Sequence, residues 1–288
     1  MSSDLLIHDK THRSAKTYLD NPTQVLAIVG ANGAGKSSLA MYLATELLQK
    51  PDLTNESRFI SIKRDEDKKE ITIETVRSLI KSLRLKQPGD AKRLVYIEEA
   101  GELSREAQNA LLKTLEQPNT DTYFILTVSD TSQLLPTLFS RTQKIVAYPV
   151  NSAQAEKYFS GKYSTAEIKS AWLLSEGLAG HLSQLLEEEE QPLKAAVASA
   201  KDFLGANRYQ RLASVDKLSK DKAELANLMS GLSRILKILH HANIKNDKAS
   251  VTENIHKARL LVKNSQNALN ANASAKAVML RLILNLRV

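Results

Sequence analysis

The feature of this sequence that most constrains its fold is the segment at residues 30–37, which reads Gly-Ala-Asn-Gly-Ala-Gly-Lys-Ser. The segment matches the pattern G-x-x-x-x-G-K-[ST]. An apolar run precedes it at residues 25–29, and apolar side chains at helical spacing follow it as far as Leu48. Because strand, glycine-rich loop and helix occur in that order, the pattern predicts a phosphate-binding loop.

Each residue type in this loop has a chemical reason to be there. Glycines allow successive backbone N–H groups to point inward around a polyphosphate, and the start of the following helix adds a positive dipole end. The Lys36 ammonium would reach the outer phosphates, and the Ser37 hydroxyl would bind Mg²⁺. The expected ligand is ATP with Mg²⁺, contacted by Gly30, Ala31, Asn32, Gly33, Ala34, Gly35, Lys36, Ser37 and Ser38. The alternative is a glycine-rich turn that binds no ligand.

The segments after the loop alternate between strand and helix patterns. Apolar or alternating runs predict further strands at residues 58–62, 93–97, 122–128 and 144–150. Segments with apolar residues at helical spacing separate these runs. Strands that alternate with helices around a phosphate-binding loop predict a parallel, doubly wound α/β sheet.

Strand signals stop after residue 150. We expect an α/β nucleotide-binding domain at residues 1–150, a small helical lid at 151–191 and an all-helical domain at 192–288. The last of these carries apolar residues at three- and four-residue spacing. That spacing is typical of helices packed in a bundle or against other subunits.

Composition limits the class of partner and the compartment. The 288 residues suit about two domains, and the net charge of +8 suits polyanionic partners. The chain has no cysteine, which excludes disulfides and Cys-ligated zinc. No apolar run approaches the roughly 18 residues that span a bilayer, and the N-terminal residues resemble neither a signal peptide nor an anchor. We therefore expect a cytoplasmic protein with no membrane partner.

Two acidic residues, Glu98 and Glu99, end the strand pattern at residues 93–97. The carboxyl end of a strand that neighbours a phosphate-binding loop is where Mg²⁺ and an attacking water would be held. The two carboxylates are therefore candidate members of the same site as Lys36.

Three blocks of sequence carry a family resemblance. They are Val-Tyr-Ile-Glu-Glu-Ala at residues 95–100, Asn-Ala-Leu-Leu-Lys-Thr-Leu-Glu-Gln-Pro at 109–118, and Leu-Leu-Pro-Thr-Leu-Phe-Ser-Arg at 134–141. Together they resemble the clamp-loader AAA+ ATPases, the bacterial DNA polymerase III gamma/tau and delta-prime subunits. The first block resembles a Walker B strand, and Ser-Arg-Thr at 140–142 resembles the S-R-C motif with its cysteine replaced. Residues 71–85 and 266–286 are similar to segments of delta-prime, the second to its last collar helix.

This resemblance implies a role in loading the ring-shaped sliding clamp onto primed DNA, with other clamp-loader subunits as partners. The α/β and lid domains would form one blade of a pentameric spiral around DNA, and the C-terminal helices would form part of its collar. DNA would be contacted through its phosphate backbone. Arg141 would act as an arginine finger on the γ-phosphate bound by the neighbouring subunit. The simpler alternative for Arg141 is a surface residue in a turn.

Several positions depart from the family's pattern. Walker B normally reads Asp-Glu, and here Glu98 replaces the Asp on the Mg²⁺ side, which weighs against hydrolysis. Glu99 matches the residue that orients the attacking water. Ser129 fits the sensor 1 position best, with Thr127 as the alternative, and Gly180 stands where active members carry the sensor 2 Arg. The four-cysteine zinc module of the family is missing.

The leading interpretation is a delta-prime-like subunit that binds ATP and, on its own, hydrolyses it weakly or not at all. A catalytically active motor subunit like gamma/tau stays open, because Lys36, Ser37 and Glu99 are all in place. A P-loop metabolite kinase is a more distant alternative, since it leaves the blocks at 109–118 and 140–142 unexplained.

Overall fold

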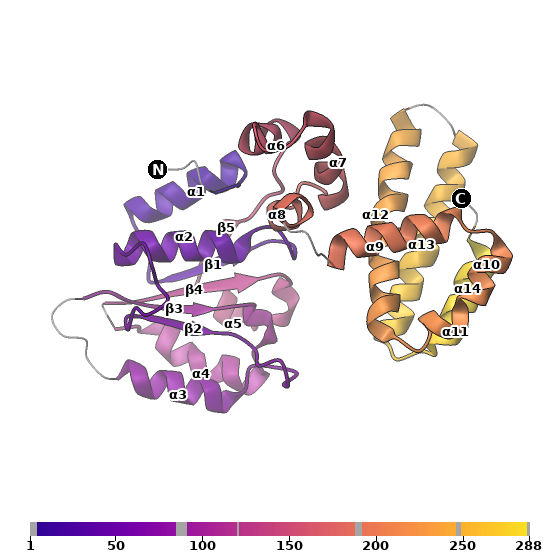
Figure 1. Ribbon diagram of the computed structural model, residues 1–288. Helices are drawn as coiled ribbons and strands as arrows, with labels where there is room; N and C mark the ends of the chain where they lie inside the picture. Colours follow the sequence, from indigo (N-terminus) through magenta and orange to yellow (C-terminus); the bar gives the residue numbers. More distant parts are fainter. Residues whose placement is uncertain (1–4, 85–90, 120, 188–191, 246–248, 287–288) are drawn as a thin grey trace. The chain divides into compact units, whose positions relative to one another are not determined.

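The computed structural model describes residues 5–84, 91–119, 121–187, 192–245 and 249–286 (Figure 1). The chain divides into two compact units. The first contains Met1–Lys162 together with Gly177–Gly180, and the second contains Tyr163–Glu176 together with His181–Val288. The finer division into three domains, with boundaries after residues 150 and 191, stays a prediction.

The described part of the first unit contains a five-stranded sheet in which every neighbouring pair of strands runs parallel. This confirms the parallel sheet that the alternation of strands and helices predicts. The spatial order is β2-β3-β4-β1-β5, so β1 and β3 both flank β4. The strands are β1 (Val25–Val29), β2 (Phe59–Ile62), β3 (Arg93–Ile97), β4 (Thr122–Val128) and β5 (Gln143–Val146).

Helices cover both faces of this sheet (Figure 1). Leu26 and Ile28 of β1 face α1 and α2, whereas Ala27 faces the side of α3, α4 and α5. Adjacent residues of β1 are thus buried on opposite faces, which explains why the run at 25–29 is apolar throughout. The helices of this unit are α1 (Asp9–Asp20), α2 (Lys36–Leu48), α3 (Ile73–Leu83), α4 (Arg105–Glu116), α5 (Pro136–Phe139) and α6 (Ser152–Phe159), with short 3-10 helices η1 (Ala100–Glu102) and η2 (Thr131–Gln133).

Side-chain caps and glycine fix where the key helices begin. The Ser104 hydroxyl accepts a hydrogen bond from the Ala107 N–H at the start of α4. Gly35 precedes α2 with φ of 85°, a left-handed conformation that a side chain would strain. α2 therefore starts directly at Lys36, at the carboxyl end of β1.

The described elements of the second unit are all helices. α12 packs against α9 and α13, and α13 packs against α14. Gly231 lets α12 approach α9 closely, because a Cβ at this position would lie 2.0 Å from the Ala196 carbonyl oxygen. The helices are α7 (Thr165–Ser175), α8 (Ala179–Glu187, whose first two residues belong to the first unit), α9 (Pro192–Gly205), α10 (Arg208–Ala213), α11 (Val215–Leu218), α12 (Lys222–Lys245), α13 (Ala249–Asn270) and α14 (Ala275–Asn285). Among the residues that the structure describes, no helix is long and apolar enough to cross a membrane.

Candidate nucleotide-binding site

The loop at residues 30–37 adopts backbone conformations that favour glycine. Gly33 and Gly35 both have positive φ, at 79° and 85°, which L-residues adopt only with strain. Gly30 packs tightly against Ala147, the residue that follows β5, because a Cβ at position 30 would lie 2.9 Å from the Ala147 carbonyl oxygen. The loop is therefore a narrow backbone cradle that leads into the N-terminus of α2, and its shape fits a polyphosphate.

Lys36 is buried at the start of α2, with 5% of its side chain exposed. Its Nζ lies 2.9 Å from Glu99 Oε1, and it donates hydrogen bonds to Ser129 Oγ at 2.7 Å and to the Ala31 carbonyl at 3.2 Å. The Ser129 hydroxyl in turn donates to Asn32 Oδ1 in the loop. Residues predicted from three separate segments thus meet around one ammonium group.

Glu99 connects the ends of β3 and β4. Its backbone adopts φ of 46°, an uncommon conformation for a residue with a side chain. The Glu99 N–H donates to Thr127 Oγ1 at 2.9 Å, and Glu99 Oε2 accepts from the Ser129 N–H at 3.0 Å. Both candidates for sensor 1 therefore contact Glu99, Thr127 through its hydroxyl and Ser129 through its backbone.

Ser37 and Glu98 supply a pair of oxygens that suits a magnesium ion. The Ser37 hydroxyl donates to Glu98 Oε1 at 3.1 Å. One hydroxyl and one carboxylate, completed by phosphate oxygens and water, form the oxygen donor set that Mg²⁺ prefers. Tyr96 lies beside them. Burial raises the pKa of its phenol, and the Ser37 and Thr127 hydroxyls offset part of that rise.

Gly180 lies directly on the loop. Its N–H donates to the Gly33 carbonyl at 2.8 Å, and a Cβ at position 180 would lie 3.0 Å from the same oxygen. The preceding Ala179 is also close, since its Cβ would lie 3.5 Å from a Cβ at Gly35. The segment that the resemblance matches to sensor 2 thus reaches the loop through its backbone and contributes no charged side chain at Gly180.

Arg141 makes its contacts away from this cluster, with α4 and α5. Its Nη2 lies 2.6 Å from Glu116 Oε1, and its Nη1 donates to the Thr137 carbonyl. Both side chains are partly exposed, Arg141 at 37% and Glu116 at 44%. The guanidinium is therefore held at the surface of the first unit.

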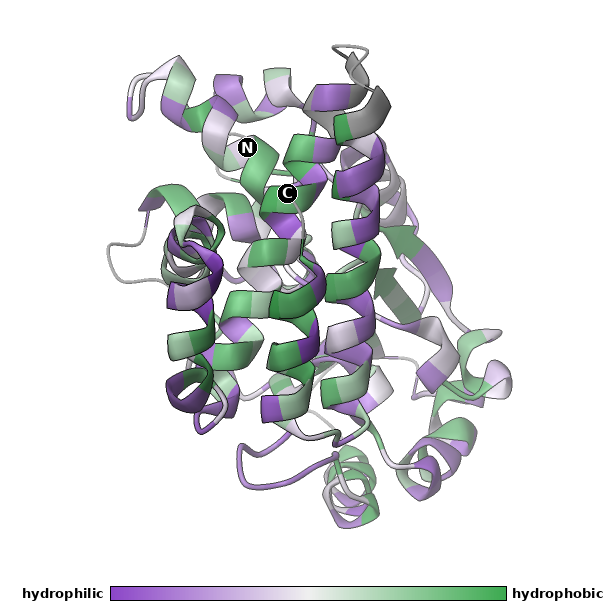
Figure 2. Ribbon diagram, turned by 90° about the vertical axis from the view of Figure 1, so that its right-hand side faces the viewer, coloured by the Kyte–Doolittle hydropathy of each residue, from purple (hydrophilic) through white to green (hydrophobic). Residues whose placement is uncertain are grey.

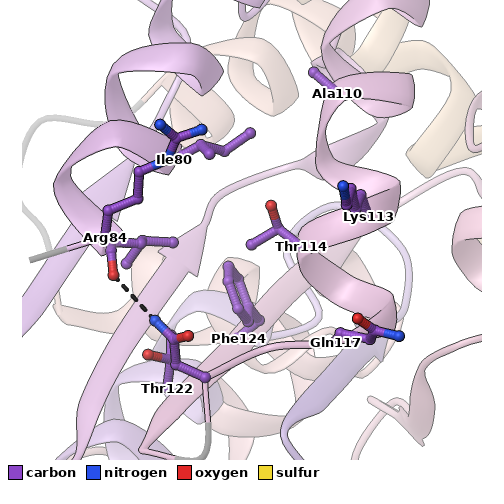
Figure 3. A pocket seen from close by; sticks show the side chains of 10 residues that line it. Ile80, Arg84, Ala110, Lys113, Thr114, Gln117, Thr122 and Phe124 are labelled. Atoms are coloured by element: carbon purple, nitrogen blue, oxygen red, sulfur yellow. Dashed lines mark hydrogen bonds between the residues drawn. The ribbon is translucent and has the colours of Figure 1, made fainter. Parts of the chain in front are cut away.

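A pocket of about 320 Å³ lies between α3 and α4, near the ends of the strands opposite to those that carry the Lys36 cluster (Figure 3). Thr122 and Phe124, near the start of β4, line it, whereas Thr127 and Ser129 stand at the other end of that strand. Arg84 and Lys113 are among its lining residues. The pocket is thus separated from the cluster around Lys36 by the length of β4.

Comparison with known proteins finds similarity within the first unit. Residues 10–151 match the family model described as DNA polymerase III, delta subunit. This range contains the loop, Glu98, Glu99, Ser129 and Arg141. Residues 10–151, just under half of the chain, are therefore similar to the DNA polymerase III delta-subunit family.

Curated relatives of this family align with the same part of the chain. DNA polymerase III subunit delta-prime of Yersinia pestis is 30% identical over 180 residues, which cover 60% of this chain and 52% of the relative. The delta-prime subunit of Haemophilus influenzae is 29% identical over 136 residues, covering 47% of this chain and 40% of the relative. Subunit tau of Salmonella typhimurium is 26% identical over 181 residues, covering 57% and 28%. The aligned part of the chain thus spans about half or less of the length of these relatives.

Within this DNA polymerase III-related unit, the structure adds residues that the sequence does not single out. Glu116 and Thr137 contact Arg141, although their role has no spacing signature. Gln108 is 2% exposed and accepts a hydrogen bond from the Leu135 N–H at 2.7 Å, so it links α4 to the segment before α5. A polar residue on the otherwise apolar face of α4 is the only sequence signal that points to Gln108.

Proposed function

We propose that this chain is a delta-prime-like clamp-loader subunit that binds ATP or ADP with Mg²⁺ and helps to load a sliding clamp onto primed DNA. The observation that carries the nucleotide proposal is the cluster of Lys36, Glu99 and Ser129 beside an intact glycine cradle. The match of residues 10–151 to the family model described as DNA polymerase III, delta subunit, supports the clamp-loader role.

Different residues of the chain would bind the Mg²⁺ ion and the phosphates. Mg²⁺, when bound, neutralises charge on the phosphates. Ser37 and Glu98 would hold it, and the N–H groups at residues 30–35 would hold the phosphates. Lys36 would exchange its contact with Glu99 for one with a phosphate oxygen. Glu99 would then be free to orient water, a role that it cannot fill while it pairs with Lys36.

Three features favour slow hydrolysis by the chain alone. Gly180 brings no cation to the phosphates, Glu98 is one methylene longer than the usual Asp, and Arg141 contacts Glu116 instead of the loop. We infer that Arg141 acts in trans on nucleotide held by a neighbouring subunit. An arginine finger is worth roughly 10³–10⁵ in rate where measured.

Subunit contacts would use the C-terminal helices. The α13 and α14 helices expose four large apolar side chains that lack full cover: Val251, Leu260, Leu280 and Leu284. Figure 2 shows apolar segments between polar ones along the helices of this unit. Leu280 and Leu284 are four residues apart on α14 and share one face. Such a face is suited to packing against a helix of a neighbouring subunit. The net charge of +8 is a separate feature, and it suits contact between the protein and DNA phosphates.

The experiment that tests the nucleotide proposal is calorimetric titration of the full chain with ADP and Mg²⁺. We expect saturable binding to one site, and loss of that binding in Lys36→Ala. Lys169→Ala, in the second unit, is the matched control and should bind like the parent. Equal affinity in parent and Lys36→Ala would overturn the proposal.

The gamma/tau-like motor is a second candidate, because Lys36, Ser37 and Glu99 are all present. Steady-state ATPase of the assembled complex separates the two roles. If this chain is a delta-prime-like regulator, Lys36→Ala in this chain alone leaves most turnover intact. If it is a motor, that variant removes a large share. Arg141→Ala should instead lower turnover of the complex and leave nucleotide binding by the isolated chain unchanged.

A further inference from the structure

Arg141 is held in one orientation by two groups from its own unit. The Glu116 carboxylate, at the last residue of α4, contacts Nη2 at 2.6 Å, and the Thr137 carbonyl in α5 accepts from Nη1. A guanidinium has five N–H donors in a rigid, planar fork. Two contacts therefore leave three donors, including that on Nε, available to a further anion.

The elements that carry these groups are fixed to one another. Buried Gln108 of α4 donates through Nε2 to the Leu103 and Gln133 carbonyls, at 3.1 and 3.0 Å, and accepts from the Leu135 N–H. Leu111 of α4 and Leu138 of α5 share one apolar core. Glu116 and Thr137 are thus held at a fixed distance from one another. The guanidinium that contacts both of them is therefore held in a fixed position.

We infer that Glu116 is a positioning residue for Arg141, which presents the free side of the guanidinium to the phosphate of a neighbouring subunit. This inference rests on the proposed trans role of Arg141. Arg loses side-chain rotamer freedom when it binds a phosphate, and a carboxylate that already restricts it lowers that cost. The Glu116 carboxylate would face one edge of the guanidinium and the phosphate the other, as the fork geometry allows.

The test uses Glu116→Ala in the complex reconstituted with the chain's own partner subunits, beside Arg141→Ala and the double variant. We expect Glu116→Ala to lower kcat roughly twofold to fivefold with an unchanged KM for ATP, the range that an exposed ion pair supports. The double variant should match Arg141→Ala alone, because Glu116 acts only through Arg141. Glu106→Ala, an exposed acid in the first turn of the same helix, is the control and should retain parental kcat.

A second measurement on the isolated chain separates this inference from the proposed function. The Arg141 Nε–Hε signal in NMR should be sharp in the parent and in Glu106→Ala, and broadened or shifted in Glu116→Ala. If Arg141→Ala leaves the ATPase of the complex intact, the trans role fails whatever Glu116 does. If Arg141→Ala lowers turnover and Glu116→Ala does not, or if the Nε–Hε signal is unaffected by Glu116→Ala, the positioning role is wrong.

Discussion

Lys36 Nζ lies 2.9 Å from Glu99 Oε1, so the cation expected to bind phosphate is paired with the carboxylate expected to orient water. The pair joins the first residue of α2 to the second residue after β3. Neither side chain can take up its proposed role while the contact persists. Nucleotide binding must therefore compete with an interaction inside the protein.

This competition predicts the effect of Glu99→Gln. Removing the carboxylate charge should raise affinity for ADP with Mg²⁺ about threefold to tenfold, because a hydrogen bond to a charged group is worth about 1 kcal/mol more than one to a neutral group. Calorimetric titration of the parent and the variant would measure the change, with Glu106→Gln as the control. Unchanged or weaker binding in Glu99→Gln would show that the pair does not oppose the ligand.

The direct contact between Ser37 and Glu98 predicts an unusual dependence on magnesium. Because the longer Glu98 already accepts a hydrogen bond from the Ser37 hydroxyl, at 3.1 Å, the hydroxyl must turn its proton away before both oxygens can bind Mg²⁺. We expect Mg²⁺ to strengthen ADP binding only modestly in the parent and by about another threefold or more in Glu98→Asp. Titrations with Mg²⁺ and with EDTA would give both ratios. Equal ratios in the two proteins would refute this account of Glu98.

The close contact between Gly180 and the loop predicts that position 180 does not accept a side chain. A Cβ there would lie 3.0 Å from the Gly33 carbonyl oxygen, so Gly180→Ala should displace the loop and weaken ADP binding at least about threefold. Gly205→Ala is the matched control, because a Cβ at Gly205 meets nothing within 4 Å. Parental affinity in Gly180→Ala would mean that the loop adjusts freely. By the same argument, Gly180→Arg should not create an active sensor 2.

The hydrogen bonds of the buried Gln108 amide predict that its replacement lowers stability strongly. Gln108→Leu would leave the Leu103 and Gln133 carbonyls and the Leu135 N–H without their partner. We expect the free energy of unfolding of the first unit to fall by about 2–4 kcal/mol, since each unpaired buried group costs roughly 1–3 kcal/mol. Urea denaturation would measure it. Asn109→Leu, at an exposed neighbouring position, should change stability far less.

Local patterns were sufficient to predict the sheet and the loop. The runs at 25–29, 93–97 and 122–128 coincide with β1, β3 and β4, because strands buried on both faces are mostly apolar along their length. The strand expected at 144–150 was too long, since β5 ends at Val146. Beyond it, the Val150 N–H bonds to the Gly177 carbonyl, a partner that no local pattern reveals.

The sequence predicts which residues belong to the candidate site, and this stays a prediction; it does not predict which of their side chains contact one another. The G-x-x-x-x-G-K-S pattern and the acids after β3 identify Lys36 and Glu99, yet nothing in their spacing says that they pair. The contact between Arg141 and Glu116 is equally invisible, because it joins the ends of two helices that only the packed core brings together. Side-chain partners between separate elements depend on tertiary structure, which single-sequence patterns do not encode.

The close crossing of α9 and α12 at Gly231 has a consequence for how the second unit could be studied. The distance between these two helices is set by one missing side chain, since a Cβ at position 231 would overlap the Ala196 carbonyl. Any larger residue there must push the two helices apart and tilt the surfaces that they carry. A substitution at position 231 therefore offers a way to shift the outer faces of these helices while every residue on those faces is kept unchanged.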